Sequence, residues 1–380
     1  MAPTQERELV PGLAGVPAAE SAVSYIDGRQ GVLEYRGIPI QVLSEESTFE
    51  EVAWLLYRGE LPRAAELEGL RAHLAEARVL PEGLHGVVRS LPAGGHPMGA
   101  LQTLVAALGL YSSADRDLVR SEEAWIELLA AAPVLVAAFE RHRRGLAPVQ
   151  PDPELGTAAN FLWMIHGERP TELAARVLDV ALILHADHTM NASTFAARVV
   201  ASTQAGPFTA CSAAVGALRG PLHGGANERV LETLEAIGSP DQVEPWLEEQ
   251  LAQGGKVMGF GHRVYKVKDP RSVNLQGLVR RLFEEQGSTP VYDVALRLEE
   301  AVVRRLGQKG IHPNVDFFSG IVYQKLGIPT DLFTPVFAIA RVAGWLAHLR
   351  EQAEGGRLFR PAQIYAGQRG RGYTKLAERG

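Results

Sequence analysis

The sequence predicts a mainly α-helical protein with one small β-hairpin near its start. Three observations support this class: apolar residues recur at helical spacing through most of the chain, capping residues stand at the ends of these periods, and strand-like alternation is rare. The helical periods cover residues 48–75, 120–145, 170–200, 240–253, 271–286, 290–306 and 334–354.

Length and composition indicate two globular domains in a reducing compartment. A chain of 380 residues and 41.1 kDa exceeds one typical domain. Its net charge of −6 argues against nucleic-acid binding by the whole surface, so any anion site must be local. The one cysteine, Cys211, excludes an internal disulfide and favours the cytoplasm. Since the longest apolar run, Leu128 to Phe139, is too short to span a membrane and the first residues lack a signal-peptide core, a soluble protein is expected.

The first element is expected at residues 22–37. Asp27-Gly28 and Gly31 separate two short β-prone runs there, which predicts a small hairpin, and its place before the helical region suggests a peripheral position.

The helices that follow have identifiable ends. Thr48 and Glu51 form a capping box, and Gly59 closes the helix. Ser239-Pro240 and Thr334-Pro335 each place a capping residue before a proline that suits the first helical turn, so both predict helix starts.

The segment GFGHRVYKVKDPR, residues 259–271, combines glycines, a histidine and several cations. Gly259 and Gly261 flank His262 and leave room for a ligand to approach the backbone. The segment, together with Lys256 upstream of it, carries a local excess of positive charge that suits phosphates or carboxylates, although a solvated basic helix start would have the same composition. The cations are Lys256, Arg263, Lys266, Lys268 and Arg271. A dinucleotide fingerprint is excluded because the third glycine and the preceding strand are missing.

Two further stretches place a titratable group beside a predicted helix start. PLHGGAN puts His223 in a glycine-rich turn, either as a polar turn residue or as an exposed imidazole. NVDFFSG puts Asp316 ahead of two phenylalanines, where it either caps the helix or acts as a carboxylate base strengthened by desolvation.

His185 and His188 lie three residues apart and would share one face if the helix from Thr171 continued. A metal is disfavoured because no further ligand motif accompanies them, so a substrate hydrogen bond or a satisfied core histidine is expected. Arg341 interrupts an apolar helical stretch, and its guanidinium needs an anion, either a structural partner or a substrate carboxylate that Arg271 and Arg360 could share.

Taken together, PLHGGAN, GFGHRVYKVKDPR, NVDFFSG and the arginine helix resemble the citrate synthase family in their order and motifs. The resemblance implies that Asp316 removes a proton from the acetyl-CoA methyl, that His223 hydrogen-bonds the developing enolate, and that His262 polarises and protonates the oxaloacetate ketone. It also implies oxaloacetate contacts from four residues and coenzyme A contacts from the basic loop. The oxaloacetate set is His188, Arg271, Arg341 and, from a partner subunit, Arg360. The coenzyme A set is Lys256, Met258, Gly259, Phe260, Gly261, Lys266 and Lys268.

The same resemblance implies an all-α homodimer, with acetyl-CoA as co-substrate, no permanently bound cofactor and no metal. A large domain is expected from residues 1–216 and 322–380, and a small domain from 217–321 is expected to close over the site. Gln102 departs from the arginine that is common in relatives, and the tail after Tyr365 matches poorly. Two alternatives stay open: a 2-methylcitrate synthase that uses propionyl-CoA, and a non-catalytic helical scaffold that binds a nucleotide or polyanion.

Overall fold

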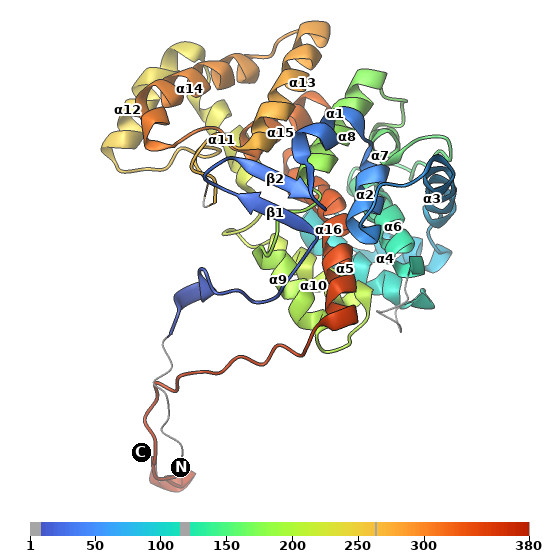
Figure 1. Cartoon of the computed structure of the whole chain (residues 1–380), viewed down its shortest axis with the longest axis vertical. Coiled ribbons are helices and arrows are strands. Elements are labelled where there is room, and N and C mark those ends of the chain that lie inside the picture. Colours follow the sequence, from blue (N-terminus) through green and yellow to red (C-terminus); the bar gives the residue numbers. More distant parts are fainter. Residues whose placement is uncertain (1–8, 115–121, 263, 380) are drawn as a thin grey trace.

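The computed structural model describes residues 9–114, 122–262 and 264–379. Within these residues the protein contains sixteen α-helices and one antiparallel sheet with the strand order β1-β2-β3 (Figure 1). The α-helical class predicted from the sequence is therefore confirmed.

The helices are α1 Ile40–Glu46, α2 Phe49–Arg58, α3 Ala64–Ala77, α4 Glu82–Ser90, α5 Pro97–Gly109, α6 Glu122–Arg143, α7 Thr157–His166, α8 Glu172–His185, α9 Ala192–Ala201, α10 Pro207–Leu218, α11 Ala226–Ile237, α12 Val243–Ala252, α13 Pro270–Gln286, α14 Pro290–Leu306, α15 Val315–Lys325 and α16 Phe333–Gly355. The strands are β1 Ser24–Asp27, β2 Val32–Tyr35 and β3 Ile38–Pro39.

Helix α16 forms the centre of the larger group of helices. It packs against α2, α5, α6, α8, α9 and α10, and Trp345 at its middle is completely buried. The apolar stretch of this helix is longer than Leu128 to Phe139, the longest apolar run recognised in the sequence. Thr330–Gly355 is long and apolar enough to cross a membrane, but 94% of its most apolar window is buried inside the protein. Its apolar character is explained by its position in the core.

The hairpin forms as predicted, but its expected peripheral position is wrong. Strands β1 and β2 pair from Ser24 opposite Tyr35 to Asp27 opposite Val32. Tyr35 is fully buried, and its hydroxyl lies 2.9 Å from the carbonyl oxygen of Asp187. The hairpin therefore packs into the core through β2 and contacts the loop after α8.

Several helical boundaries follow tertiary contacts instead of the sequence pattern. The capping box of Thr48 and Glu51 and the left-handed Gly59 (φ 94°) end α2 as predicted. Ser239, in contrast, makes no side-chain cap, and Pro240 begins a short 3-10 turn before α12. Helices α5 and α10 were missed because they are apolar on most faces and therefore show little amphipathic periodicity.

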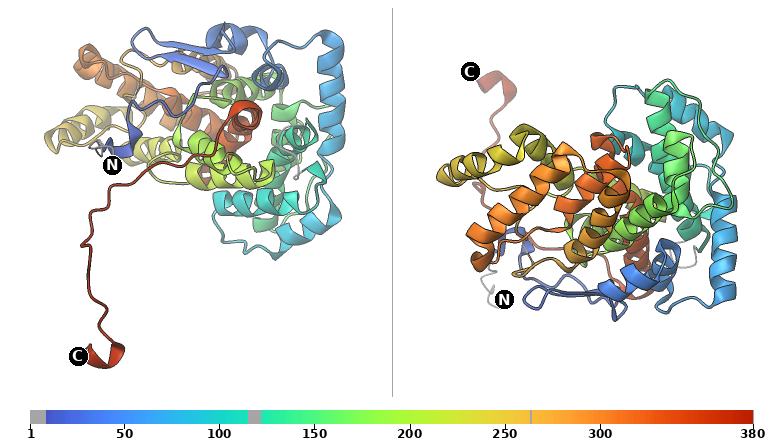
Figure 2. Two further views of the ribbon diagram at one scale, coloured as in Figure 1. Left: turned by 60° about the horizontal axis from the view of Figure 1, so that its bottom comes forward. Right: turned by 90° about the horizontal axis from the view of Figure 1, so that it is seen from above.

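Two groups of helices flank the hairpin. Helices α11, α12 and α14 gather at one end, α13 and α15 connect them to α8, and the larger group is centred on α16 (Figures 1 and 2). Residues 356–379 leave α16 and extend away from the folded body (Figure 2). The segments that carry the predicted site converge between the two groups.

Candidate active site

His262 and Asp316 lie on two chain segments that run side by side. Phe260 pairs with Pro313 in an antiparallel bridge, and Gly261 N–H donates to the carbonyl of His312 at 2.9 Å. The Asn314 side chain reinforces the pairing with a 3.0 Å hydrogen bond to the Gly261 carbonyl. This short ladder brings the predicted acid and the predicted base to neighbouring positions, although 53 residues separate Gly261 from Asn314.

The hydrogen bonds of His262 define which ring nitrogen can donate. Its Nδ1 accepts the backbone N–H groups of Val264 at 3.1 Å and Tyr265 at 3.2 Å. Because Nδ1 accepts, the proton of the neutral ring lies on Nε2. Burial, assisted by the positive charge of Arg271, lowers the pKa of His262 to about 4, so the ring is a neutral Nε2–H donor at physiological pH.

His223 has the opposite arrangement. Its Nε2 accepts the backbone N–H of Ser193 at 3.2 Å and lies 2.9 Å from the Ser193 hydroxyl. Trp345, which lies on α16, donates its Nε1–H to the Ser193 hydroxyl at 3.1 Å. The neutral ring therefore carries its proton on Nδ1. Burial and the charge of Arg341 lower the pKa of His223 to about 4, so it too is a neutral donor.

Asp316 occupies the first turn of α15, where Asn314 is the capping residue. The Asn314 side chain accepts the Asp316 N–H at 3.0 Å, so the capping role considered for Asp316 belongs to its neighbour. Among the described residues, no side-chain donor is hydrogen-bonded to the Asp316 carboxylate. Burial raises the pKa of this carboxyl above its ordinary value, opposed by Arg271 and Arg341. Asp316 is therefore a free carboxylate with increased basicity.

Arg271 and Asp269 form a buried ion pair at the start of α13. The guanidinium donates through Nε at 3.1 Å and through one terminal nitrogen at 2.8 Å, and Asp269 also caps the helix by accepting Arg271 N–H. Asp269 accepts Val315 N–H at 3.3 Å as well, which ties the pair to the helix of Asp316. The second terminal nitrogen of Arg271 makes no hydrogen bond to any described residue and can donate to another anion.

Arg341 and His188 present unused polar groups to the same cluster. Arg341 is 1% exposed and donates through Nε to the carbonyl of His185 at 2.8 Å, while its terminal nitrogens have no hydrogen-bond partner among the described residues. Burial lowers its pKa to about 10, which keeps it charged at neutral pH. The His188 ring lies 5.3 Å from the His262 ring, and its buried Nε2 has no hydrogen-bond partner among the described groups.

His185 and His188 do not share a helix face, which corrects the expectation of a continuous helix. Helix α8 ends at His185, and Asn191 caps the separate helix α9. Asp187 stabilises the break between them by accepting Thr189 N–H at 3.0 Å. His185 instead donates to the carbonyl of Ala181 at 2.7 Å and is a core residue. Among the described residues, no group of three or more potential metal ligands is found.

The basic loop is less uniform than its composition suggests. Lys256 and Lys266 are exposed, whereas the Lys268 ammonium lies 3.2 Å from the Glu299 carboxylate. Arg263 lies outside the described residues. Gly259 does not leave room for a ligand: an added Cβ would lie 2.7 Å from Val230, so this glycine serves packing. Gly261 does have open space on that side.

The other residues predicted to contact substrate lie in two places: Met258 and Phe260 in this loop, and Arg360 outside it. Phe260 stacks edge-on against Phe317, with ring centroids 4.7 Å apart, and Met258 packs partly buried beside the core. Arg360 lies on the extended C-terminal segment, is exposed, and bonds to the adjacent Pro361 carbonyl at 3.2 Å. Within one described chain, Arg360 is therefore not part of the cluster.

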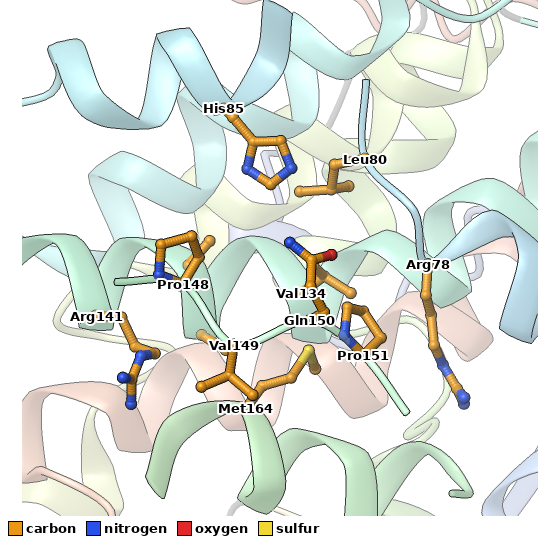
Figure 3. Close-up of a pocket in the computed structure, with 12 residues that line it drawn as sticks. Arg78, Leu80, His85, Val134, Arg141, Pro148, Val149, Gln150, Pro151 and Met164 are labelled. Carbon is orange, nitrogen blue, oxygen red and sulfur yellow. The ribbon is translucent and has the colours of Figure 1, made fainter. Parts of the chain in front are cut away.

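A separate cavity lies in the large helical group between α4, α6 and α7 (Figure 3). Its volume is about 10 Å³, enough for one water molecule, and none of the candidate site residues lines it. It therefore does not compete as a substrate site.

The sequence did not reveal the residues that orient the candidate site groups. Ser193 and Trp345 hold His223, and Asp269 holds Arg271. The Tyr265 ring lies 4.8 Å from His262 and 5.7 Å from His188, and its buried hydroxyl has no hydrogen-bond partner among the described groups. Tyr265 lies within the GFGH segment, and its place in that motif was the one available signal.

A helical fold with neutral histidines, a half-buried carboxylate and two buried arginines is typical of an enzyme that acts on anionic substrates. A family profile described as "Citrate synthase, C-terminal domain" matches residues 12–362. Citrate synthase from Synechocystis sp. is 52% identical over 97% of this chain and 93% of that protein, and the one from Acidithiobacillus ferridurans is 44% identical over 98% and 99%. The chain belongs to the citrate synthase family.

Solved structures agree with this assignment. Citrate synthase from Pyrobaculum aerophilum superposes with a TM-score of 0.93 at 40% identity, covering 98% of this chain and 95% of that one. Citrate synthase from Thermoplasma acidophilum, solved as a ternary complex with carboxymethyl coenzyme A and oxaloacetate, gives a TM-score of 0.91 at 33% identity, with 98% and 100% covered. The chain is therefore a transferase-type enzyme and not the helical scaffold considered above.

The low pKa values of the two histidines predict a pH dependence of stability. Below pH 6.5 these two rings take up protons in the unfolded chain but not in the folded one, so their contribution to the free energy of unfolding should fall as the pH drops from 6.5 to about 4 and then level off. For His262→Asn, we expect the difference between urea unfolding at pH 7.5 and pH 5 to shrink by about 1–2 kcal/mol. The exposed His73→Asn is the control, and an equal change in both variants would contradict the assignment.

Proposed function

We propose that this enzyme condenses acetyl-CoA with oxaloacetate through the trio of Asp316, His223 and His262. The observation that carries the proposal is the pair of opposite histidine tautomers: His223 is an Nδ1–H donor and His262 an Nε2–H donor, both neutral. Two neutral donors suit a reaction in which negative charge develops first on one carbonyl oxygen and then on another.

In the first step, Asp316 removes a proton from the methyl carbon of the thioester. A thioester methyl is a weak acid, so the carboxylate needs both a raised pKa and stabilisation of the enolate oxygen. Burial supplies the first, and the Nδ1–H of His223 supplies the second.

In the second step, the enolate carbon attacks the ketone carbon of oxaloacetate. His262 donates its Nε2 proton to the ketone oxygen as the carbon–carbon bond forms. Water then hydrolyses the citryl thioester, which breaks the carbon–sulfur bond and releases citrate and CoA.

The two carboxylates of oxaloacetate would be held by Arg341, the free terminal nitrogen of Arg271, and His188. Two buried cations balance the dianion, and the unpartnered Nε2 of His188 can donate a hydrogen bond once the ring proton lies there. The exposed Lys256 and Lys266 would face the phosphates of coenzyme A.

The proposed assembly is a homodimer in which the partner subunit's Arg360 completes the site. The support is the C-terminal segment, which extends from the body and exposes large apolar side chains that a monomer would leave in water. These side chains are Leu358, Ile364, Tyr365, Tyr373 and Leu376. Phe359 anchors the base of the segment by stacking on Phe195 at 5.5 Å.

The activity is tested by release of free CoA thiol. The protein with oxaloacetate and acetyl-CoA is expected to release thiol continuously, and no release would contradict the proposal.

The alternative substrate, propionyl-CoA, differs by one methylene, which an apolar pocket discriminates by only about 10- to 200-fold in kcat/KM. We expect acetyl-CoA to be preferred, and a higher kcat/KM for propionyl-CoA would identify a 2-methylcitrate synthase.

A further inference from the structure

The β1–β2 hairpin contacts two loops of the site, the one that carries His188 and the one that carries His262. At its base, the Ser24 hydroxyl donates to the Asp187 carboxylate and accepts Thr189 N–H at 3.1 Å, and Tyr35 bonds the Asp187 backbone. These bonds hold the loop on which His188 lies. The turn of the hairpin reaches the opposite loop, which carries His262.

The contact at the turn is made by backbone atoms. Lys266 N–H donates to the carbonyl of Gly28 at 2.8 Å. A Cβ built on Gly28 would lie 2.2 Å from the carbonyl oxygen of Val264 and 2.7 Å from its carbon. No side chain fits in this space, and the obstructing atoms are backbone atoms that no rotamer change can move.

The turn itself is preorganised. Asp27 accepts the N–H groups of Arg29 at 2.8 Å and Gln30 at 3.0 Å, which fixes the turn that presents Gly28. On the far side of the same loop, a Cβ on Gly310 would lie 2.7 Å from the Lys266 carbonyl oxygen. The backbone of residues 264–266 is therefore enclosed between the hairpin and the turn after α14.

This enclosed backbone is what orients His262. The donors to its Nδ1 are the N–H groups of Val264 and Tyr265, and the Tyr265 N–H belongs to the same peptide group as the Val264 carbonyl that contacts Gly28. A displacement of this backbone would remove the hydrogen bonds that fix the His262 ring, whose centroid lies 5.3 Å from that of the His188 ring.

We propose that the hairpin acts as a bracket: it holds the loops of His188 and His262 in a fixed position relative to each other. Gly28 is then a positioning residue for the condensation. This inference rests on the proposed function and adds a residue that the family comparison does not assign. The hairpin and residues 264–266 fall on opposite sides of the proposed domain division, so the contact joins the two proposed domains.

Gly28→Ala separates this role from a folding role. The φ angle of Gly28 lies outside the positive region, so alanine can adopt the backbone conformation and the only obstacle is the Val264 carbonyl. Alanine is thus compatible with a protein in which the loop has moved away. We expect folding to persist, kcat to fall about 10- to 100-fold, and KM for oxaloacetate to rise at least about tenfold, since misplacing a catalytic group by about 1 Å has effects of this size.

The experiment measures kcat, both KM values and the thermal unfolding midpoint for the wild type, Gly28→Ala, Ser24→Ala and Gly69→Ala. Gly69 lies in α3 with no atom within 4 Å of an added Cβ, so it is the matched control and should behave as the wild type. Ser24→Ala loosens the base of the bracket and should raise oxaloacetate KM by a smaller factor, while its KM for acetyl-CoA stays within about twofold. Gly28→Ala also displaces the backbone of Lys266, so its KM for acetyl-CoA should rise, but by a smaller factor than its KM for oxaloacetate.

The outcomes distinguish the bracket from the proposed function. A wild type without thiol release would overturn the proposed function. A wild type that turns over, with unchanged oxaloacetate KM and kcat in Gly28→Ala, would overturn the bracket alone. Equal rises in both KM values, accompanied by a lowered unfolding midpoint, would show a general structural role and would also overturn it. If Gly28→Ala does not fold, Ser24→Ala decides by the same criteria.

Discussion

Asp316→Asn is expected to lower kcat by about 10³-fold or more while oxaloacetate binding is retained, because the substitution removes the only proposed base and keeps the shape of the side chain. The helix start should persist, since Asn314 provides the cap and position 316 contributes only its backbone N–H. Loss of the negative charge near Arg271 and Arg341 should leave affinity for the oxaloacetate dianion unchanged or increased.

The measurement combines thiol release with calorimetric titration of oxaloacetate. Asp241→Asn, at an exposed position of the 3-10 turn before α12, is the control for the loss of one carboxylate and should keep full activity. Turnover within tenfold of the wild type in Asp316→Asn would reject Asp316 as the base. Loss of oxaloacetate binding together with turnover would show that Asp316 shapes the site instead of performing the proton transfer.

Arg271→Met should have the largest combined effect on stability and binding. It leaves Asp269 as a buried carboxylate without its partner, which typically costs about 3–5 kcal/mol of unfolding free energy. It also removes one of the two buried cations proposed for oxaloacetate, so affinity should fall at least about 100-fold.

The double variant Asp269→Asn/Arg271→Met separates these two effects. Asparagine removes the unpaired charge and can still accept a backbone N–H at the start of α13, so unfolding free energy measured in urea should recover by more than half. Oxaloacetate affinity should not recover. Restored binding in the double variant would mean that Arg271 has only a structural role, and normal binding in Arg271→Met would contradict its proposed contact.

Features that depend only on neighbouring residues could be predicted from the sequence. The cap at Thr48, the turn at Asp27-Gly28 and the helical class follow from short-range hydrogen bonding and periodicity, and the structure confirms them. The convergence of distant motifs could be expected only through their resemblance to a family. No pattern within PLHGGAN or GFGHRVYKVKDPR reveals which other segment faces it.

Other features could not be predicted from the sequence because they depend on contacts between distant segments. Helices α5 and α10 lack a polar face, and the break between α8 and α9 is held by Asp187 with help from Ser24, 163 positions away in the chain. The hairpin looked peripheral because the packing of Tyr35 and the fit of Gly28 against Val264 involve partners far along the chain.

By itself, the sequence determined the helical class, the hairpin turn and the set of chemical groups available for catalysis, because these are properties of single residues and their neighbours. Only the tertiary structure decided which nitrogen of His223 and of His262 carries the proton, since the donors Ser193, Val264 and Tyr265 are placed by folding. It also decided that Arg271 is paired with Asp269 and that the hairpin contacts the loops of His188 and His262. Hydrogen bonds and burial act over distances of a few ångströms, and only the folded chain sets which groups come that close.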